Sequence, residues 1–202
     1  MICNLANLPC PMKHSISELR KRNRELRAGL DPATLEQAAR KLVERIGSLP
    51  EYAQAGCIAA YFAINGEISL EYIIEQALLQ GKQIFLPNLD KQSLRFSPYF
   101  QQQKMRINRY KLPEPDVSNE EMLRPEAIDL VLVPLVAFDP QCNRIGMGGG
   151  FYDRSFAFRK NPDQLRPVLI GVAHELQKVD QLEPEPWDVQ LDMVVTDQAV
   201  YR

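Results

Sequence analysis

The stretch Ile128-Asp129-Leu130-Val131-Leu132-Val133 decides the fold class of this 202-residue chain. Aliphatic side chains fill it almost without interruption, and a strand without polar alternation is typical of the centre of a parallel sheet covered on both faces. A glycine-rich segment follows it, and after that a predicted helix over Phe151–Lys160. The sequence therefore predicts an α/β fold with this stretch as an inner strand.

Shorter strands and helices alternate on both sides of that stretch. Further strands are predicted at Cys57–Ala63, Gln83–Pro87, Ser93–Ser97, Met105–Tyr110, Pro167–Ala173 and Leu191–Thr196, and a helix at Ser69–Gln80. We interpret residues 90–125 as an insertion within the domain. The alternation predicts a single-domain, mostly parallel sheet flanked by helices in a three-layer, Rossmann-like arrangement, whose ligands bind at the carboxyl ends of the strands.

The N-terminal part of the chain predicts two amphipathic helices. Apolar side chains recur at helical spacing from Ile16 to Leu30, and Asp31-Pro32 is a helix start followed by a second periodic run to Leu49. We expect the two helices to form a helical hairpin. The predicted organisation is a flexible leader over residues 1–14 and one domain over residues 15–202.

Composition excludes several classes of protein. Hydrophobic residues make up 45% of the chain, which is enough for one core, and the longest apolar run, Leu130 to Phe138, is too short to span a membrane. The net charge of −2 is too balanced for bulk nucleic-acid binding. The four cysteines, Cys3, Cys10, Cys57 and Cys142, have no metal-ligand spacing, and we expect them to be reduced. Without a signal sequence, the chain is expected to be cytoplasmic, as a monomer or weak homo-oligomer.

Charge is distributed unevenly along the chain. Residues 13–27 hold six basic and two acidic side chains, whereas residues 174–202 hold seven acidic and two basic ones. The first region can meet anions and the second can meet cations.

One segment carries the pattern of a ligand-binding loop: Arg144-Ile145-Gly146-Met147-Gly148-Gly149-Gly150-Phe151-Tyr152-Asp153. Four of the ten glycines fall within five positions, between a strand and a predicted helix. Glycine lets backbone amides approach a ligand, and the start of a helix adds unpaired N–H groups, so the segment favours an anion cradle. Arg144 would supply a forked cation for a phosphate.

The loop is of neither common phosphate-binding type. The sixth position counted from Gly146 is Phe151, so the dinucleotide fingerprint fails, and no Gly-Lys-Ser/Thr triplet is present. A plain flexible connection or tight packing of the helix on the strand remains the alternative to a phosphate loop. For Asp153 the alternatives are a magnesium ligand and a favourable interaction with the helix dipole. For Glu67 they are a role at a ligand site and capping of the helix that starts near Ser69.

In these segments the sequence resembles the 5-formyltetrahydrofolate cyclo-ligase family, also called methenyltetrahydrofolate synthetases. The main block of the resemblance is Val133–Asp139 followed by Arg144–Asp153, which looks like the family's most distinctive motif. The supporting blocks, in family order, are Leu19-Arg20-Lys21, Tyr61-Phe62 with Glu67, Gly81-Lys82 with Leu86-Pro87, Pro113-Glu114-Pro115, and Leu191-Asp192-Met193-Val194-Val195-Thr196.

The resemblance implies an ATP-dependent reaction. ATP phosphorylates the formyl oxygen of 5-formyltetrahydrofolate, a neighbouring folate nitrogen closes the ring, and ADP, phosphate and 5,10-methenyltetrahydrofolate result. It implies ATP contacts from Arg20 and from the loop Arg144–Tyr152, and Mg²⁺ held by Asp153 and Asp192. It also implies that Phe62 lies against the pterin plane of the folate and that Glu67 accepts hydrogen bonds from its N–H groups.

The chain departs from the family pattern at two positions. Ile16 stands where members often have a lysine, so either Lys13 or Lys21 substitutes or the contact is missing. Gly149 stands where several members have lysine, although glycine is also familiar there. Two other functions remain open on the sequence alone. One is a sugar-phosphate isomerase on a related α/β scaffold, which would need no ATP. The other is a non-catalytic nucleotide-binding protein, which would bind ATP without turning over folate.

Overall fold

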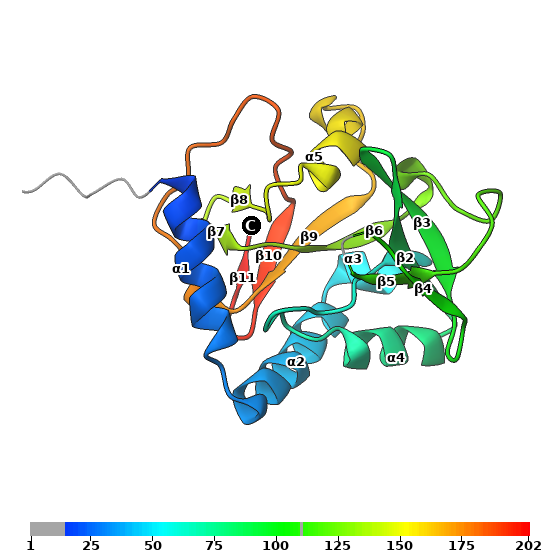
Figure 1. Cartoon of the computed structure of the whole chain (residues 1–202), viewed down its shortest axis with the longest axis horizontal. Coiled ribbons are helices and arrows are strands. Elements are labelled where there is room, and N and C mark those ends of the chain that lie inside the picture. The colour runs from blue at the N-terminus through cyan, green and yellow to red at the C-terminus, as the bar shows by residue number, and fades with distance from the viewer. Residues whose placement is uncertain (1–14, 110) are drawn as a thin grey trace, which may run out of the picture.

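The computed structural model describes residues 15–109 and 111–202, so the predicted leader lies outside the described residues. Its main feature is a seven-stranded sheet in the order β11-β10-β9-β6-β1-β2-β3 (Figure 1). The parallel strands are β1 (Cys57–Ala59), β2 (Gln83–Asp90), β6 (Leu130–Pro134), β9 (Val168–Ala173) and β10 (Met193–Thr196). The edge strands β3 (Ser93–Tyr99) and β11 (Val200–Tyr201) are antiparallel to their neighbours. The predicted mostly parallel α/β sheet is confirmed.

The central position of β6 follows from its side chains. Each residue from Leu130 to Val133 is at most 1% exposed. The strand lies between β1 and β9, and successive side chains enter cores on opposite faces of the sheet. The near-continuous aliphatic stretch is therefore buried on both sides, as predicted.

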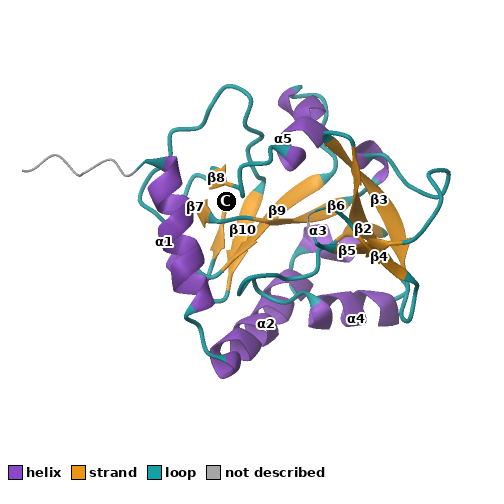
Figure 2. Ribbon diagram, in the orientation of Figure 1, coloured by secondary structure: helices purple, strands orange, loops and turns teal. Residues whose placement is uncertain are grey.

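Helices and loops cover the two faces of the sheet (Figure 2). The helices α2 (Pro32–Gly47), α3 (Pro50–Gln54) and α4 (Glu71–Leu79) lie on one face, where Leu42 and Ile74 join the larger core cluster. The short helix α5 (Phe151–Ser155) and the 3₁₀ helix η2 (Ala157–Lys160) lie on the other, where Phe156 packs. None of the helices within the described ranges has the length and apolar character that a membrane span requires.

The two N-terminal helices form as predicted but are placed separately. Helix α1 (Ile16–Ala28) begins with a capping box in which Ser15 and Glu18 bond reciprocally, and Asp31 caps α2. Helix α1 contacts β7 (Ala137–Phe138) and the 3₁₀ helix η3 (Glu175–Gln177), whereas α2 contacts α4 and β10. The helices therefore pack mainly on different elements and not against each other as the expected hairpin, and α1 stands beside the glycine-rich region (Figure 1).

Several element boundaries differ from the sequence predictions. Strand β1 ends at Ala59, four residues early. The helix predicted over Phe151–Lys160 breaks at Phe156, whose buried ring packs near Phe96 and Tyr152, so tertiary packing interrupts the helix. The segment treated as an insertion contributes β3 to the main sheet and forms a small hairpin of β4 (Met105–Ile107) and β5 (Pro113–Pro115), after which the 3₁₀ helix η1 (Pro125–Ala127) precedes β6.

The strand order creates a switch point between β1 and β6. The first parallel strand, β1, pairs on one side with the second, β2, and on the other with the third, β6. Chains that leave the carboxyl ends of such neighbours diverge, and ligands bind in the crevice between them. The segments that leave β1 and β6 contain Glu67 and the glycine-rich loop respectively.

Candidate active site

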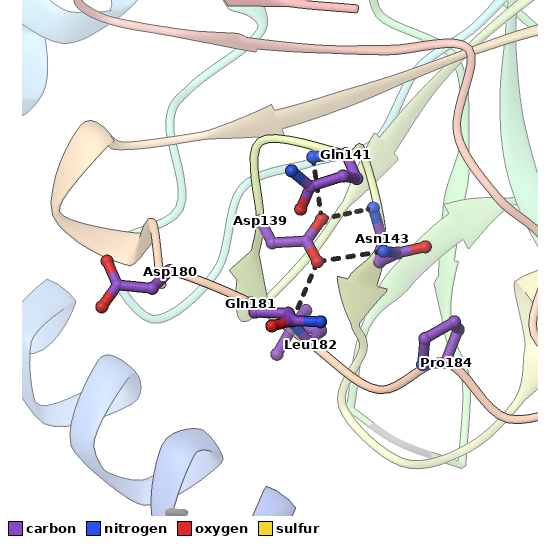
Figure 3. Close-up of a pocket in the computed structure, with 7 residues that line it drawn as sticks. All are labelled: Asp139, Gln141, Asn143, Asp180, Gln181, Leu182 and Pro184. Atoms are coloured by element: carbon purple, nitrogen blue, oxygen red, sulfur yellow. Dashed lines mark hydrogen bonds between the residues drawn. The ribbon is translucent and has the colours of Figure 1, made fainter. Parts of the chain in front are cut away.

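A small hairpin presents the glycine-rich loop. Strands β7 and β8 (Arg144–Ile145) pair after β6, and the buried carboxylate of Asp139 organises the turn between them. It accepts hydrogen bonds from the amides of Gln141 (3.1 Å), Asn143 (2.9 Å) and Leu182 (2.9 Å), and from Asn143 Nδ2 (2.9 Å), as Figure 3 shows. Because these bonds tie the turn to the 180–184 segment, the hairpin from which the glycine-rich loop extends is held in place.

Glycine is required by the shape of this loop. Gly148 and Gly150 have φ values of +97° and +64°, in the region that side chains other than glycine rarely adopt. A Cβ at Gly149 would lie 2.8 Å from the Phe151 ring, and one at Gly150 would lie 2.5 Å from Arg154 Nη1. At Gly146 an added Cβ would meet nothing within 4 Å. Most of the glycines therefore fix one backbone path.

Helix α1 brings Arg20 to this loop. Its Nε donates to the carbonyl of Gly146 at 2.8 Å, and its guanidinium carbon lies 3.5 Å from the position of a Cβ at Gly148. Asn23 holds the helix in place by donating to the carbonyl of Val136 at 3.1 Å. The predicted approach of Arg20 to the loop is present. Of the two lysines suggested to substitute at position 16, Lys21 is exposed and Lys13 lies outside the described residues.

Arg144 and Asp153 lie at the loop but contact each other. Arg144 Nη2 is 2.6 Å from Asp153 Oδ1, and its other terminal nitrogen donates to the carbonyl of Val189. The amide of Val189 in turn donates to Asp153 Oδ1 at 3.2 Å. Because the Arg144 side chain is 6% exposed, its charge is directed at this carboxylate and at the 189 segment.

Asp192 lies at the amino end of β10 and has partners of its own. Its Oδ1 is 2.7 Å from Arg159 Nη2, and its Oδ2 accepts from the amide of Leu169 at 2.7 Å. Asp153 and Asp192 are therefore held by different arginines and different amides. Within residues 15–109 and 111–202, no group of three or more His, Cys, Asp or Glu side chains has the arrangement of a metal site.

Glu67 follows β1 on a tight turn. Asn65 and Gly66 have positive φ, and Glu67 Oε2 accepts from the amide of Ile64 at 3.2 Å. Helix α4 begins later, with Ser69 Oγ accepting from the amide of Glu71 at 3.2 Å, so the capping interpretation of Glu67 is wrong. Burial raises the pKa of Glu67, while the Ile64 amide and a nearby arginine act to lower it.

The two loops that leave β1 and β6 approach each other. Burial raises the pKa of Tyr61 and of Tyr152, and the charge of Glu67 raises both further, so this carboxylate acts on a residue of the glycine loop. Phe62 is half-buried and meets the Tyr99 ring edge to face, with centroids 5.6 Å apart. An acceptor, an aromatic surface and a glycine loop thus gather at the switch point.

Sequence reasoning missed three residues around this site: Arg27, Arg154 and His174. Arg154 donates to the carbonyl of Gly149 at 2.6 Å, and His174 Nε2 lies 3.0 Å from the carbonyl of Gly66. One signal was available for Arg27. It lies four residues after Asn23, which interrupts the apolar stripe of α1, so the two polar side chains share the buried face.

Known proteins match this chain along nearly its whole length. The model of the 5-formyltetrahydrofolate cyclo-ligase family matches residues 12–197. The 5-formyltetrahydrofolate cyclo-ligase of Escherichia coli K12 is 34% identical over 182 residues, covering 89% of this chain and 98% of its own. That of Haemophilus influenzae is 36% identical over 177 residues, covering 86% and 93%.

A solved structure agrees with these sequence matches. The NMR structure of Aquifex aeolicus 5,10-methenyltetrahydrofolate synthetase superimposes with a TM-score of 0.78 at 28% identity, covering 93% of this chain and 92% of that one. The sequence matches and the shared architecture agree with the ordered blocks quoted above. The chain belongs to the 5-formyltetrahydrofolate cyclo-ligase family.

Proposed function

We propose that the protein converts 5-formyltetrahydrofolate to 5,10-methenyltetrahydrofolate with consumption of ATP and release of ADP and phosphate. Membership of the family gives the cyclo-ligase activity. The observation that carries the site assignment is the approach of Arg20 to the glycine loop beside the turn of Glu67, at the sheet's switch point.

The chemistry explains why such a site needs ATP. A formyl amide is a poor electrophile, and its oxygen is a poor leaving group. Transfer of the terminal phosphoryl group of ATP to that oxygen, with loss of ADP, makes the formyl carbon reactive. A neighbouring folate nitrogen then attacks the carbon, and the oxygen departs as phosphate. The enzyme's contribution is mainly alignment and neutralisation of charge.

The glycine loop and Arg20 are proposed to hold the ATP phosphates. Backbone amides from Gly146 to Gly150 can line an anion, with Ile145, Met147, Phe151 and Tyr152 completing the loop's path. With its Nε fixed on Gly146, Arg20 keeps two further nitrogens beside Gly148 for phosphate oxygens. Arg144 would act next to them, where its ion pair with Asp153 holds the start of α5 in place.

Mg²⁺ is proposed to accompany ATP, and the two predicted ligands fit it unequally. The contacts of Asp153 with Arg144 and Val189 both use Oδ1. Its second carboxylate oxygen can therefore face the loop as a ligand of the type that Mg²⁺ prefers. Asp192 already uses both oxygens, on Arg159 and Leu169, so ligation there would have to displace the guanidinium. Bound Mg²⁺ would neutralise charge on the phosphate oxygens.

Replacing Asp153 with Asn tests the magnesium assignment. We expect the variant to need more Mg²⁺ for half-maximal turnover, measured by titrating the metal at fixed ATP. The matched control is Asp129→Asn, which also removes a carboxylate from an ion pair with an arginine but is neither of the predicted ligands, and it should leave the magnesium dependence unchanged. Equal magnesium dependence in Asp153→Asn and the unmodified enzyme would return Asp153 to a purely structural role.

Phe62 and Glu67 are proposed to contact the folate. Phe62 offers a half-buried ring to the flat pterin, and the Glu67 carboxylate can accept hydrogen bonds from pterin N–H groups. The Glu67 side chain is 8% exposed, so hydrogen bonds to its charge would be little screened by water. This arrangement would orient the formyl group toward the phosphates.

The activity is tested by mixing the protein with Mg²⁺, ATP and 5-formyltetrahydrofolate and recording the conjugated methenyl chromophore. No chromophore at high enzyme concentration would overturn the proposal. Glu67→Gln should raise the KM for folate by a factor that corresponds to about 1.5–3 kcal/mol, the usual worth of a hydrogen bond to a charged group, without changing the KM for ATP. Glu71→Gln, an exposed glutamate four residues on, is the matched control.

A further inference from the structure

A buried arginine lies behind the proposed folate site. Arg27 is 1% exposed on the inner side of α1. Its Nη1 donates to the carbonyl of Leu135 at 3.1 Å and lies 3.6 Å from Glu67 Oε1. Its Nε and Nη2 are buried without a hydrogen-bond partner in the described structure. The guanidinium therefore keeps only part of the bonding that it would have in water.

The burial of Arg27 is not explained by a gain in the stability of the fold. Removing a guanidinium from water is expensive, and N–H groups left unpaired in the interior add to that cost. Replacement of a buried ion pair by apolar residues of similar size is often neutral or stabilising. What the fold obtains at this position is a fixed positive charge facing Glu67.

The turn that carries Glu67 is held against Arg27. Gly66 adopts φ +75°, and a Cβ there would lie 2.5 Å from the Arg27 carbonyl oxygen, so the turn and helix α1 are in direct backbone contact. His174 Nε2 lies 3.0 Å from the carbonyl oxygen of the same glycine. The position of the Glu67 carboxylate relative to the guanidinium is thus set by these two contacts of the turn.

We propose that Arg27 is a positioning residue for the folate site: its guanidinium keeps the Glu67 carboxylate ionised and oriented to accept hydrogen bonds from the substrate. The inference rests on the proposed role of Glu67 in binding folate. Arg27 itself is buried behind the carboxylate, and it acts on the substrate through Glu67.

The charges around Glu67 leave this task to Arg27. Burial raises the pKa of Glu67, and Arg27 is the charged side chain that opposes it. Tyr61 and Tyr152 have raised pKa values and stay neutral. His174 has a pKa lowered by its burial, so it adds no positive charge near neutral pH.

Two charges lie further out. Arg144 acts on Tyr152 and is paired with Asp153, and Asp197 acts on His174. Neither replaces the guanidinium beside Glu67. Removing Arg27 should therefore raise the pKa of Glu67 and protonate it in a range where the native enzyme keeps it charged.

The test compares Arg27→Met with two matched variants at saturating ATP. Arg27→Lys restores a positive charge. Asn23→Leu removes a buried bond between the same helix and the same segment, 3.1 Å to Val136, without touching Glu67. We expect Arg27→Met to lower kcat/KM for folate about tenfold on the acid side of its pH profile, where less of Glu67 stays charged than in the native enzyme.

The test records kcat/KM for folate as a function of pH. The decline of kcat/KM on the acid side, its acid limb, should move to higher pH in Arg27→Met and return toward the native position in Arg27→Lys. Asn23→Leu should lower thermal stability and leave the limb in place. The KM for ATP should stay within about twofold in Arg27→Met and Arg27→Lys, as expected for a contact confined to the folate side. An unmoved acid limb in Arg27→Met, or an equal movement in Asn23→Leu, would overturn the inference.

Two further measurements separate this inference from the proposed function. If Glu67→Gln leaves the KM for folate unchanged, the assignment of Glu67 itself fails. If Glu67→Gln raises it and Arg27→Met shifts no limb, only the positioning role fails. Should Arg27→Met not fold, a comparison of Arg27→Lys with Arg27→Gln gives the same information. When either substitution is combined with Glu67→Gln, it should no longer shift the acid limb of the pH profile.

Discussion

Substituting Gly148 by alanine tests the loop that the proposed mechanism needs. Gly148 has φ +97°, which costs a residue with a Cβ about 1–3 kcal/mol if the backbone keeps its path. The added methyl group itself would be tolerated, since the Arg20 guanidinium carbon lies 3.5 Å away. The expected effect therefore comes from backbone strain. If ATP requires the native path, its affinity should fall by roughly 5- to 150-fold, the equivalent of that strain.

Two other glycines provide matched controls. Gly146→Ala lies in the same loop, where an added Cβ meets nothing within 4 Å, and it should bind ATP normally. Gly81→Ala places the same kind of strain, at φ +75° with open space around it, in the turn between α4 and β2. It should lower stability without affecting ATP.

The measurement is calorimetric titration of each variant with ATP and Mg²⁺, paired with a thermal unfolding curve. Loss of ATP affinity in Gly148→Ala alone, with comparable melting temperatures for Gly148→Ala and Gly81→Ala, is the expected pattern. Native affinity in Gly148→Ala would refute the cradle. So would an equal loss in Gly146→Ala, because the effect would then not come from the positive φ.

Two stability predictions concern groups outside the nucleotide contacts. Asp139→Asn should reduce the free energy of unfolding in urea by about 1–3 kcal/mol, because an amide puts donors where the buried carboxylate accepts them; the exposed Asp180→Asn beside it should change nothing measurable, and an equal loss there would contradict the reasoning. Burial lowers the pKa of His174 in the folded protein, so on acidification the unfolded chain binds the proton of this histidine first. The contribution of neutral His174 to the free energy of unfolding should therefore be complete above about pH 6.5 and decline as the pH falls. In His174→Gln, unfolding curves across that range should lack this part of the decline, and an unaltered slope would be the contrary result.

Much of the fold could be predicted because local patterns and burial agree. The aliphatic stretch at Leu130–Val133 is fully buried at the centre of the sheet, and Asp31 caps its helix as expected. The helix predicted through Phe156 fails for a non-local reason. That ring is buried against Phe96 from another strand, and no periodicity within residues 151–160 reports such a contact.

The site was harder to predict than the fold because the contacts of its charged side chains depend on the three-dimensional structure and not on sequence spacing. A loop arginine before a glycine run suggests a phosphate, yet Arg144 is paired with Asp153, nine residues later. The resemblance pointed to Glu67, which lies on a turn, but the arginine that faces it lies on helix α1. Arg27 and its partner Leu135 are 108 residues apart, and sequence spacing carries no information on that contact.

Helix α1 docks on segments that lie more than a hundred residues after it in the chain. Its hydrogen bonds to Val136, Leu135 and Gly146 span 113, 108 and 126 residues, so during synthesis the helix emerges long before the segment it docks on exists. Closing such distant contacts is slow, and a substrate that bridges helix and loop lowers the free energy of the docked form. ATP bound between Arg20 and the loop should thus stabilise the docked form of α1 and slow its cleavage by proteases.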